Sequence, residues 1–358
     1  MPRVARRRLM TGTEIDQTTM ILAGDVGGTK CNLGLFLQDG LTLRSVFQRR
    51  LATREYAGFE NLVGDFLIQA TADGNNDASE IDAAGFGVAG VVAGGRHYSE
   101  NLPWVVDVTA LANKLNLKNI RLLNDLTATA LSLERLSLND FVSLNSGTPA
   151  QNTTRAVIAA GTGLGEAILF WDGEKYQVAA AEGGQADFAP RTEREIQLLS
   201  RLRVQLPHVS CEEIVSGRGF RRIHEFLKPS VRHASFESSE GAREGNQGGN
   251  AASEITQLGL AQSCPVCVET LGFWTEIFGG VTGNFALQTM ALGGIYIAGG
   301  IAVKILSKLK DGTFFKSFCG TSKLAPVLAR IPISVVVNED APIWGAAYEA
   351  LISSRVRP

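Results

Sequence analysis

Near the start of the chain lies the stretch Ile21-Leu22-Ala23-Gly24-Asp25-Val26-Gly27-Gly28-Thr29-Lys30, followed by an apolar run from Leu33 to Leu37. An apolar run, a glycine-rich turn and a second apolar run predict two strands joined by a tight turn. The pattern recurs in the run Ala156 to Ala160, the turn Gly161-Thr162-Gly163-Leu164-Gly165 and the run Ala167 to Phe170. This repetition predicts two related lobes rather than two unrelated domains.

Both turns have a composition that suits phosphate binding. Because glycine has no Cβ, its backbone N–H group can come close to a phosphate. The second turn lacks the G-x-G-x-x-G spacing and leads into a strand, and the first turn lacks G-x-x-x-x-G-K-[ST]. Taken singly, each turn is equally well explained as a hairpin that needs glycine for steric reasons. The repetition, with Asp25 inside the first turn, favours a nucleotide held in a cleft between two lobes.

The composition is that of an ordinary soluble globular protein. The 358 residues suffice for two domains, with 45% apolar and 20% charged residues. A net charge of −2 gives no indication of a nucleic-acid or membrane partner. No run approaches the ~18 apolar residues of a spanning helix. The arginines near the start lead into polar residues rather than the apolar part of a signal peptide.

The five cysteines do not form a disulfide framework for a chain of this length, and reduced thiols in the cytoplasm fit best. Cys264-Pro265-Val266-Cys267 is compatible with a redox pair or with half of a zinc site. Because no second Cys or His pair lies at metal spacing, buried thiols near the start of a helix are the favoured interpretation.

Strands and helices alternate along the chain, which predicts an α/β core. Helices are expected at 59–70, 111–117, 127–136, 193–202, 217–227, over most of 258–290 and at 341–352, and strands at 83–92, 120–123, 294–301 and 331–337. Residues 1–19 are expected to be a disordered extension. Residues 228–252 are rich in Ser, Gly, Glu and Asn, which predicts a mobile surface loop.

The pair Asn124-Asp125 follows a buried strand and precedes a helix. An Asp in this position can cap the helix, and a helix N-terminus keeps a carboxylate ionised. An ionised Asp at the carboxyl end of a strand is also well placed as a general base towards a substrate hydroxyl. The sequence leaves both interpretations open.

Two acidic segments follow the second hairpin. Glu182-Gly183-Gly184-Gln185 offers an acceptor and a mixed donor and acceptor, which suits sugar hydroxyls, although a polar surface turn has the same composition. Glu212 and Glu213 precede a short apolar segment. Either is a solvated charge or a second sugar acceptor.

Taken together, the chain resembles the bacterial glucokinases of the hexokinase and actin-like ATPase superfamily, in the branch without a zinc-binding cysteine motif. The resemblance covers nearly everything from Met20 to Ile352, with eight motifs in family order. These are Leu22–Lys30, Gly87–Gly90, Asn101–Trp104, Leu123–Asp125, Gly161–Gly165, Glu182–Pro190, Val215–Gly217 and Tyr296–Ile301.

The resemblance implies an α/β, two-lobed actin-like ATPase (ribonuclease H-like) fold with a duplicated strand-hairpin core and an interlobe cleft. The small lobe is expected at 20–134 plus 336–358 and the large lobe at 135–335. Family members close their lobes over glucose and are usually dimers, so a cytoplasmic homodimer is expected.

The function implied is the entry step of glycolysis, ATP-dependent phosphorylation of D-glucose at its 6-hydroxyl. Asp125 takes the place of the catalytic base. The sugar-binding positions correspond to Asn101, Asn124, Asp125, Glu182, Gln185 and Glu212. The ATP-binding positions correspond to Gly24, Asp25, Val26, Gly27, Gly28 and Thr29 in the first phosphate loop, Gly161, Thr162, Gly163 and Gly165 in the second, and Gly299 and Gly300 on the adenosine side. Asp25 is expected to lie near Mg²⁺, through water.

One departure concerns the sugar side, because the family usually has His where this chain has Gln185. Both side chains hydrogen-bond a hydroxyl, but Gln cannot become cationic. A kinase for another hexose, such as mannose or fructose, therefore stays open. A non-catalytic sugar sensor is the next alternative, although such relatives normally carry a helix-turn-helix that residues 1–19 are too short and polar to form. An actin-like structural ATPase would lack the sugar-binding residues.

Overall fold

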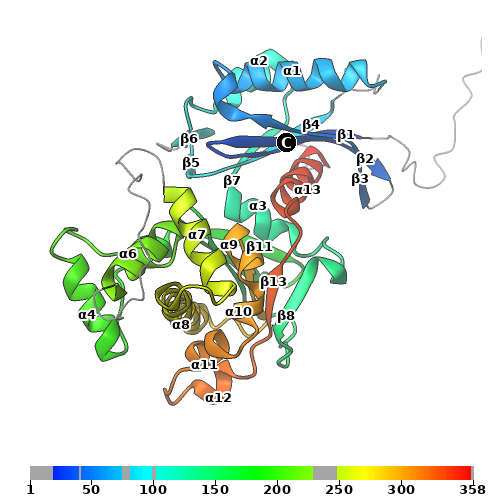
Figure 1. Cartoon of the computed structure of the whole chain (residues 1–358). Coiled ribbons are helices and arrows are strands. Elements are labelled where there is room, and N and C mark those ends of the chain that lie inside the picture. Colours follow the sequence, from blue (N-terminus) through cyan, green and yellow to red (C-terminus); the bar gives the residue numbers. More distant parts are fainter. Residues whose placement is uncertain (1–18, 40–41, 75–80, 99–101, 229–247, 356–358) are drawn as a thin grey trace, which may run out of the picture. The chain divides into compact units, whose positions relative to one another are not determined.

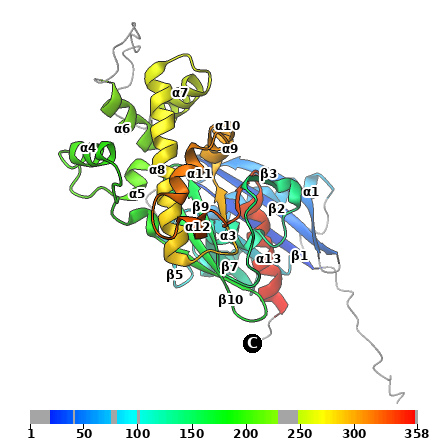
Figure 2. The ribbon, with the colours of Figure 1, turned by 90° about the horizontal axis from the view of Figure 1, so that it is seen from below.

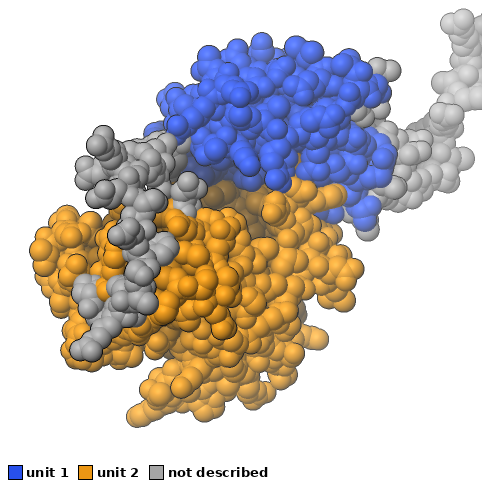
Figure 3. All heavy atoms as spheres, in the orientation of Figure 1, with its two compact units in different colours: residues 1–122, 346–358 blue, residues 123–345 orange. Residues whose placement is uncertain are grey.

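The computed structural model describes residues 19–39, 42–74, 81–98, 102–228 and 248–355, drawn as ribbon in Figure 1. The chain forms two compact units, coloured separately in Figure 3. Unit 1 comprises residues 1–122 and 346–358, and unit 2 residues 123–345. These limits differ from the expected ones at 134/135 and 335/336. The difference arises because α3 (Asp125–Ser132) packs on strands of unit 2.

In the described part of unit 1, five strands form one sheet in the order β3-β2-β1-β4-β7. β1 pairs antiparallel with β2 and parallel with β4, and every β1 residue except Asp25 is buried. A second, two-stranded sheet joins β5 to β6. The strands are β1 (Met20–Val26), β2 (Lys30–Asp39), β3 (Thr42–Ala52), β4 (Ala83–Val88), β5 (Val91–Ala93), β6 (Arg96–Tyr98) and β7 (Ile120–Asn124).

Helices α1 (Phe59–Ala72) and α2 (Val108–Leu115) lie together beside the sheet of unit 1 (Figure 1). The apolar face of α1 follows the predicted spacing, and Phe59 meets Phe86 of β4 edge to face at 5.0 Å between ring centroids. The C-terminal part of α13 (Ala341–Arg355) also belongs to this unit, where the backbone of Ala346 contacts Gly85 in β4.

In the described part of unit 2, six strands form a sheet in the order β11-β10-β9-β12-β13-β8. The strands are β8 (Phe141–Asn145), β9 (Arg155–Ala160), β10 (Leu164–Trp171), β11 (Tyr176–Ala181), β12 (Gly294–Ala298) and β13 (Ile333–Val336). β9 pairs antiparallel with β10 and parallel with β12, as β1 does with β2 and β4. The predicted duplication of the strand hairpin is therefore confirmed.

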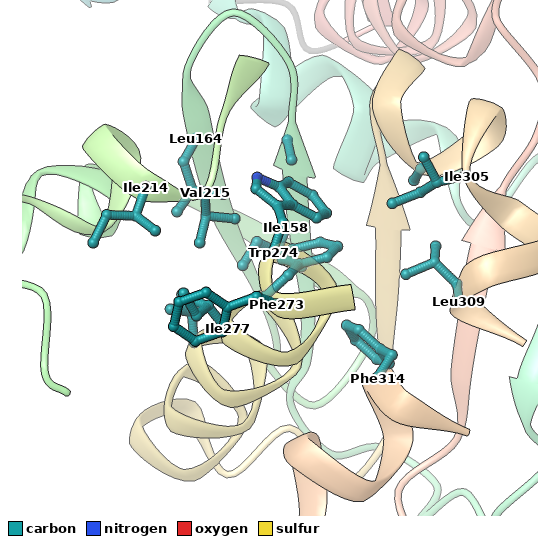
Figure 4. Packing of buried hydrophobic residues seen from close by; sticks show 14 of the residues in the cluster. Ile158, Leu164, Ile214, Val215, Phe273, Trp274, Ile277, Ile305, Leu309 and Phe314 are labelled. Carbon is teal, nitrogen blue, oxygen red and sulfur yellow. The ribbon is translucent and has the colours of Figure 1, made fainter. Parts of the chain in front are cut away.

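The core of unit 2 is built around α8 (Pro265–Thr289), whose Trp274 stacks on Phe220 at 4.5 Å between ring centroids. Figure 4 shows Trp274 and Ile277 of α8 facing the sheet that carries Ile158. Figure 2 shows α8 running beside α11. The other helices are α4 (Glu193–Leu202), α5 (Cys211–Ile214), α6 (Gly217–Leu227), α7 (Gly248–Leu260), α9 (Gly300–Lys304), α10 (Leu306–Leu309), α11 (Thr313–Cys319) and α12 (Ala325–Leu328).

Most predicted elements are present with small shifts of their ends. The helices expected at 193–202 and 217–227 have those limits. The strand expected at 294–301 ends at Ala298, because Gly299 has a φ of +89° and α9 begins after it. Of the two segments predicted to be mobile, residues 1–18 and 229–247 lie outside the described residues. Residues 248–252 begin α7 instead of belonging to a loop.

All five cysteines lie in the described residues and are free thiols. Cys264 caps the N-terminus of α8, where its Sγ accepts a hydrogen bond from the backbone N–H of Cys267 at 3.4 Å. Burial raises the pKa of the Cys267 thiol. The interpretation as buried thiols at a helix start is confirmed. Within the described chain, no helix has the length and apolar character needed to cross a bilayer.

Candidate active site

The first glycine turn, residues 27–29 between β1 and β2, is held by neutral hydrogen bonds within unit 1. The N–H of Gly27 donates to the carbonyl of Lys30 at 3.0 Å. The buried Thr53 donates its hydroxyl to the carbonyl of Gly27 at 2.7 Å and its N–H to the carbonyl of Thr29 at 3.1 Å. Thr29 is exposed, and the Asp25 side chain at the end of β1 is half-buried.

The second glycine turn, residues 161–163 between β9 and β10, is held by a carboxylate. The N–H of Leu164 donates to Oε2 of Glu212 at 3.0 Å, and the N–H of Gly217 donates to the carbonyl of Gly161 at 2.9 Å. A Cβ on Gly163 would collide with the Glu212 carboxylate. The turn is therefore attached to α5 and to the start of α6.

Asp125 is the first residue of α3, directly after β7. Its neighbour Asn124 is the N-cap, with Oδ1 accepting from the N–H groups of Leu126 at 2.9 Å and Thr127 at 3.3 Å. The cap of α3 is therefore Asn124, and the sequence-based possibility that Asp125 is the cap does not hold. One oxygen of Asp125, Oδ1, accepts from the N–H of Leu126 at 2.9 Å.

Burial raises the pKa of Asp125 to about 6, despite the opposing hydrogen bonds from Leu126 and from its own backbone N–H. The negative charge of Glu182 also raises this pKa, which places the two carboxylates within electrostatic reach of one another. The loss of hydration on burial therefore outweighs the stabilisation of the charged carboxylate by backbone N–H groups at the start of α3. A pKa about one unit below neutral still leaves Asp125 ~90% ionised at pH 7.

Glu182 and Gln185 border a single 3₁₀ turn, η4 (Gly183–Gln185), where the N–H of Gln185 donates to the carbonyl of Glu182 at 3.0 Å. Both side chains are exposed. Gly184 beneath them is buried, and a Cβ there would collide with the carbonyl of Leu164. The turn that carries the proposed sugar contacts therefore sits directly on the first residues of β10.

Glu212, which was expected to bind sugar, has hydrogen-bond partners within the protein. Besides its bond to Leu164, its Oε1 accepts from Nη2 of Arg218 at 2.8 Å, and its side chain is half-buried. Its neighbour Glu213 instead pairs with Arg222. Glu212 therefore joins the second glycine turn to α6 through Arg218.

The structure brings Asn124, Asp125, Glu182, Gln185, Glu212 and the second turn into unit 2, whereas the first turn belongs to unit 1. Asn101 lies outside the described residues. Gly299 follows β12, and a Cβ there would lie 2.6 Å from the carbonyl of Ala160, so this glycine adjoins the second turn. Gly300 has open space at the Cβ position.

Sequence reasoning missed two residues that contact this site. Arg218 pairs with Glu212, and Glu166 contacts Gly183 under the η4 turn. Glu166 carried a signal, because it is a charged residue directly between the second glycine turn and the apolar run that begins at Ala167. Arg218 carried none that a sequence alone displays.

Comparison with solved structures defines the class of protein. The chain superposes on glucokinase from an Antarctic psychrotroph with a TM-score of 0.79 and 25% identity, over 94% of this chain and 100% of that one. It also superposes on a ROK-family glucokinase from Streptomyces griseus, solved with glucose and AMPPNP, with a TM-score of 0.58 and 19% identity over 93% and 99% of the two chains. The fold is that of a sugar kinase of the actin-like ATPase type.

The sequence comparisons identify the family. A family model described as Glucokinase matches residues 22–352. The chain is 34% identical to a glucokinase of Nostoc sp., over 92% of this chain and 98% of the relative. The chain belongs to the glucokinase family.

Proposed function

We propose that this chain transfers the γ-phosphoryl group of ATP to the 6-hydroxyl of D-glucose, with Asp125 as the general base. The observation that supports this most is the placement of the Asp125 carboxyl. It is half-buried at the end of β7, is held on Oδ1 by the N–H of Leu126, and lies close to Glu182. The family name of the relatives supports glucose as the substrate.

Asp125 accepts the proton of the 6-hydroxyl as that oxygen forms its bond to the γ-phosphorus and the bond to the β,γ-bridging oxygen of ATP breaks. The transition state of phosphoryl transfer is loose, so that positioning and charge neutralisation supply most of the catalysis and a modest base suffices. A carboxylate with a pKa of about 6 is ionised at neutral pH. This pKa is also close enough to the working pH for the carboxylate to accept the proton of the hydroxyl.

The two glycine turns are proposed to bind the phosphates of ATP through their backbone N–H groups and the hydroxyls of Thr29 and Thr162. The relative solved with AMPPNP supports ATP as the donor. Asp25 suits Mg²⁺, because this ion takes one or two carboxylates and fills its other positions with water and phosphate oxygens. When bound, Mg²⁺ would neutralise charge on the phosphates.

Glucose is proposed to bind Asn101, Asn124, Glu182, Gln185 and Glu212. Since Oδ1 of Asn124 caps α3, its contact to the sugar would come from the amide nitrogen. Exposed side chains at Glu182 and Gln185 are compatible with this role.

The test of the proposed function is Asp125→Asn. Loss of a general base is expected to lower kcat by about 10²–10⁴-fold. Glucose binding, measured by calorimetry, should persist, because the amide keeps the shape and the hydrogen bond from Leu126. Turnover near that of the parent, measured as formation of glucose 6-phosphate, would sink the assignment.

Gln185 is tested separately, since it stands where the family usually has His. The parent and Gln185→His are compared across glucose, mannose and fructose with ATP. If Gln185 sets the choice among hexoses, the ranking changes in the variant. An unchanged ranking shows that Gln185 is a neutral replacement.

We also propose that the chain acts as a homodimer in the cytoplasm at the entry to glycolysis, on the strength of its family resemblance. Light scattering of the purified protein tests the dimer. A monomer at working concentrations contradicts it.

A further inference from the structure

Glu166 is a buried carboxyl on the inward face of β10. Its side chain is 6% exposed and lies on the strand face that carries Leu164 and Ile168, both part of the apolar core. Burial alone raises its pKa to about 7, and no charge or hydrogen bond among the described residues offsets that burial. Burying a carboxyl without such a partner lowers the stability of the folded chain, which suggests that Glu166 has a functional role.

The duplicated hairpin shows that the fold does not need a carboxyl here. In unit 1 the last paired residues of the hairpin are Val26 and Cys31, and in unit 2 they are Ala160 and Leu164. Two residues further along the second strand lie Leu33 in unit 1 and Glu166 in unit 2. Leu33 is fully buried. The hairpin of unit 1 therefore forms with an apolar residue, Leu33, at the position that Glu166 occupies in unit 2.

Glu166 lies under the turn that carries the proposed sugar contacts. A Cβ on Gly183 would collide with the carboxyl of Glu166, which supplies the three atoms nearest to that position. Across the strands, Glu166 pairs with Ala181, the residue before Glu182. The side chain thus adjoins the first residue of η4 and the strand that leads into it.

A cavity of about 90 Å³ lies beside this carboxyl. Its titratable or charged lining groups are Glu166, Asp187, Arg191 and Cys211, and α8 contributes the neutral Asn284 and Gln288. Arg191 is paired with Glu195. Burial, followed by the charges of Glu166 and Asp187, raises the pKa of Cys211 to about 11, so the thiol is neutral near pH 7.

We propose that Glu166 is a positioning residue for the sugar-binding turn, whose change of charge alters the placement of Glu182 and Gln185. The inference rests on the proposed function. The neutral carboxyl packs against Gly183 without hydration. The ionised carboxylate draws water into the adjoining cavity, which loosens the turn, whereas the exposed Asp187 is paired with His208. Affinity for glucose is therefore higher when Glu166 holds its proton, while the phosphoryl-transfer step at Asp125 is unaffected.

The first experiment measures KM for glucose and kcat between pH 6 and pH 8.5 in the parent, in Glu166→Gln and in Glu174→Gln. Glu174 is exposed at the far end of the same hairpin, so its variant makes the same chemical change away from the turn. The parent and Glu174→Gln should show KM rising several-fold above pH 7. Glu166→Gln should keep the low-pH KM throughout, with kcat and its fall towards pH 6 unchanged.

The second experiment uses the close contact at Gly183. Gly183→Ala is expected to raise KM for glucose at least fivefold, and less than twofold in a chain that also carries Glu166→Ala, since the methyl group then has room. Additive effects of the two changes overturn the proposal, as does a KM profile in Glu166→Gln that matches the parent. Absence of glucose phosphorylation by the parent itself would instead contradict the proposed function.

Discussion

The two glycine turns have the same place in the same strand order, yet they are held in different ways. The first turn is held by neutral hydrogen bonds that Thr53 donates to the backbone carbonyls of Gly27 and Thr29. The second depends on Glu212, whose carboxylate also pairs with Arg218. The two copies of the hairpin thus share their strand pairing but differ in the groups that hold the turn. In unit 2 that support comes from Glu212, a residue that we also propose to bind sugar.

Among changes that test this comparison of the two turns, the largest expected effect comes from Gly163→Ala, which places a methyl group against Glu212. Displacing this charged hydrogen-bond acceptor should cost ~2–3 kcal/mol, or about 30- to 150-fold in kcat/KM for ATP. Gly161→Ala is the matched control in the same turn, because nothing lies within 4 Å of a Cβ there. Equal losses in both variants would show that the Glu212 contact does not matter.

The second prediction concerns the pH dependence of stability in unit 2. The folded pKa values of Asp125, about 6, and Glu166, about 7, lie above the values of 3.8 and 4.5 for unperturbed carboxyls. Their contribution to stability is therefore full below about pH 4 and is lost as the pH rises through 6 to 7. Glu166→Gln should be more stable than the parent at pH 8, by on the order of 1–3 kcal/mol.

Urea unfolding followed by tryptophan fluorescence measures this difference, with Trp274 reporting from the core of unit 2. The advantage of Glu166→Gln should shrink towards pH 4, while Glu174→Gln behaves as the parent does. A difference that is the same at pH 8 and pH 4 would contradict a buried, titrating Glu166.

A smaller effect is expected from Glu212→Gln, which keeps the shape and removes the charge. Weakening a charge-assisted bond by ~1 kcal/mol should raise KM about fivefold. Because Glu212 joins the second turn to the sugar side, KM should rise for ATP and for glucose together. Arg221→Gln, on the exposed face of α6, serves as the control. A change confined to one substrate would separate the two roles.

The smallest effect is expected from Thr53→Val in the first turn. It removes the neutral bond to Gly27, worth ~1 kcal/mol at most, so KM for ATP should rise no more than about fivefold. KM for glucose should not change, since the hydrogen bonds of Thr53 go to the backbone of the first turn. A matching rise for glucose would show that the first turn is also linked to the sugar side.

The repeat and most helices could be predicted because they are local patterns. Apolar spacing placed α1 well, the helix predicted at 217–227 has the limits of α6, and glycine turns between apolar runs placed both hairpins. The unit boundary was less accessible, since only packing decides that α3 joins unit 2.

The site could be predicted as a set of residues but not as a set of contacts. Glu212 lies 48 residues from Leu164, and no local pattern announces their hydrogen bond. The raised pKa of Asp125 depends on burial, which a short motif does not encode. The sequence left Asp125 open as a helix cap or as a general base, and only the geometry shows that Asn124 is the cap.

The order in which the two units can fold during synthesis follows from where α13 packs. Unit 2 is one continuous segment, residues 123–345, whereas unit 1 combines two segments that are distant in sequence, 1–122 and 346–358. The sheet of unit 1 is covered at Gly85 by the backbone of Ala346 and the side chain of Ala350. The segment synthesised first must therefore wait for one synthesised more than 250 residues later. During that interval unit 2 can complete its core, while a glycine-lined face of the nascent N-terminal sheet remains open to chaperones.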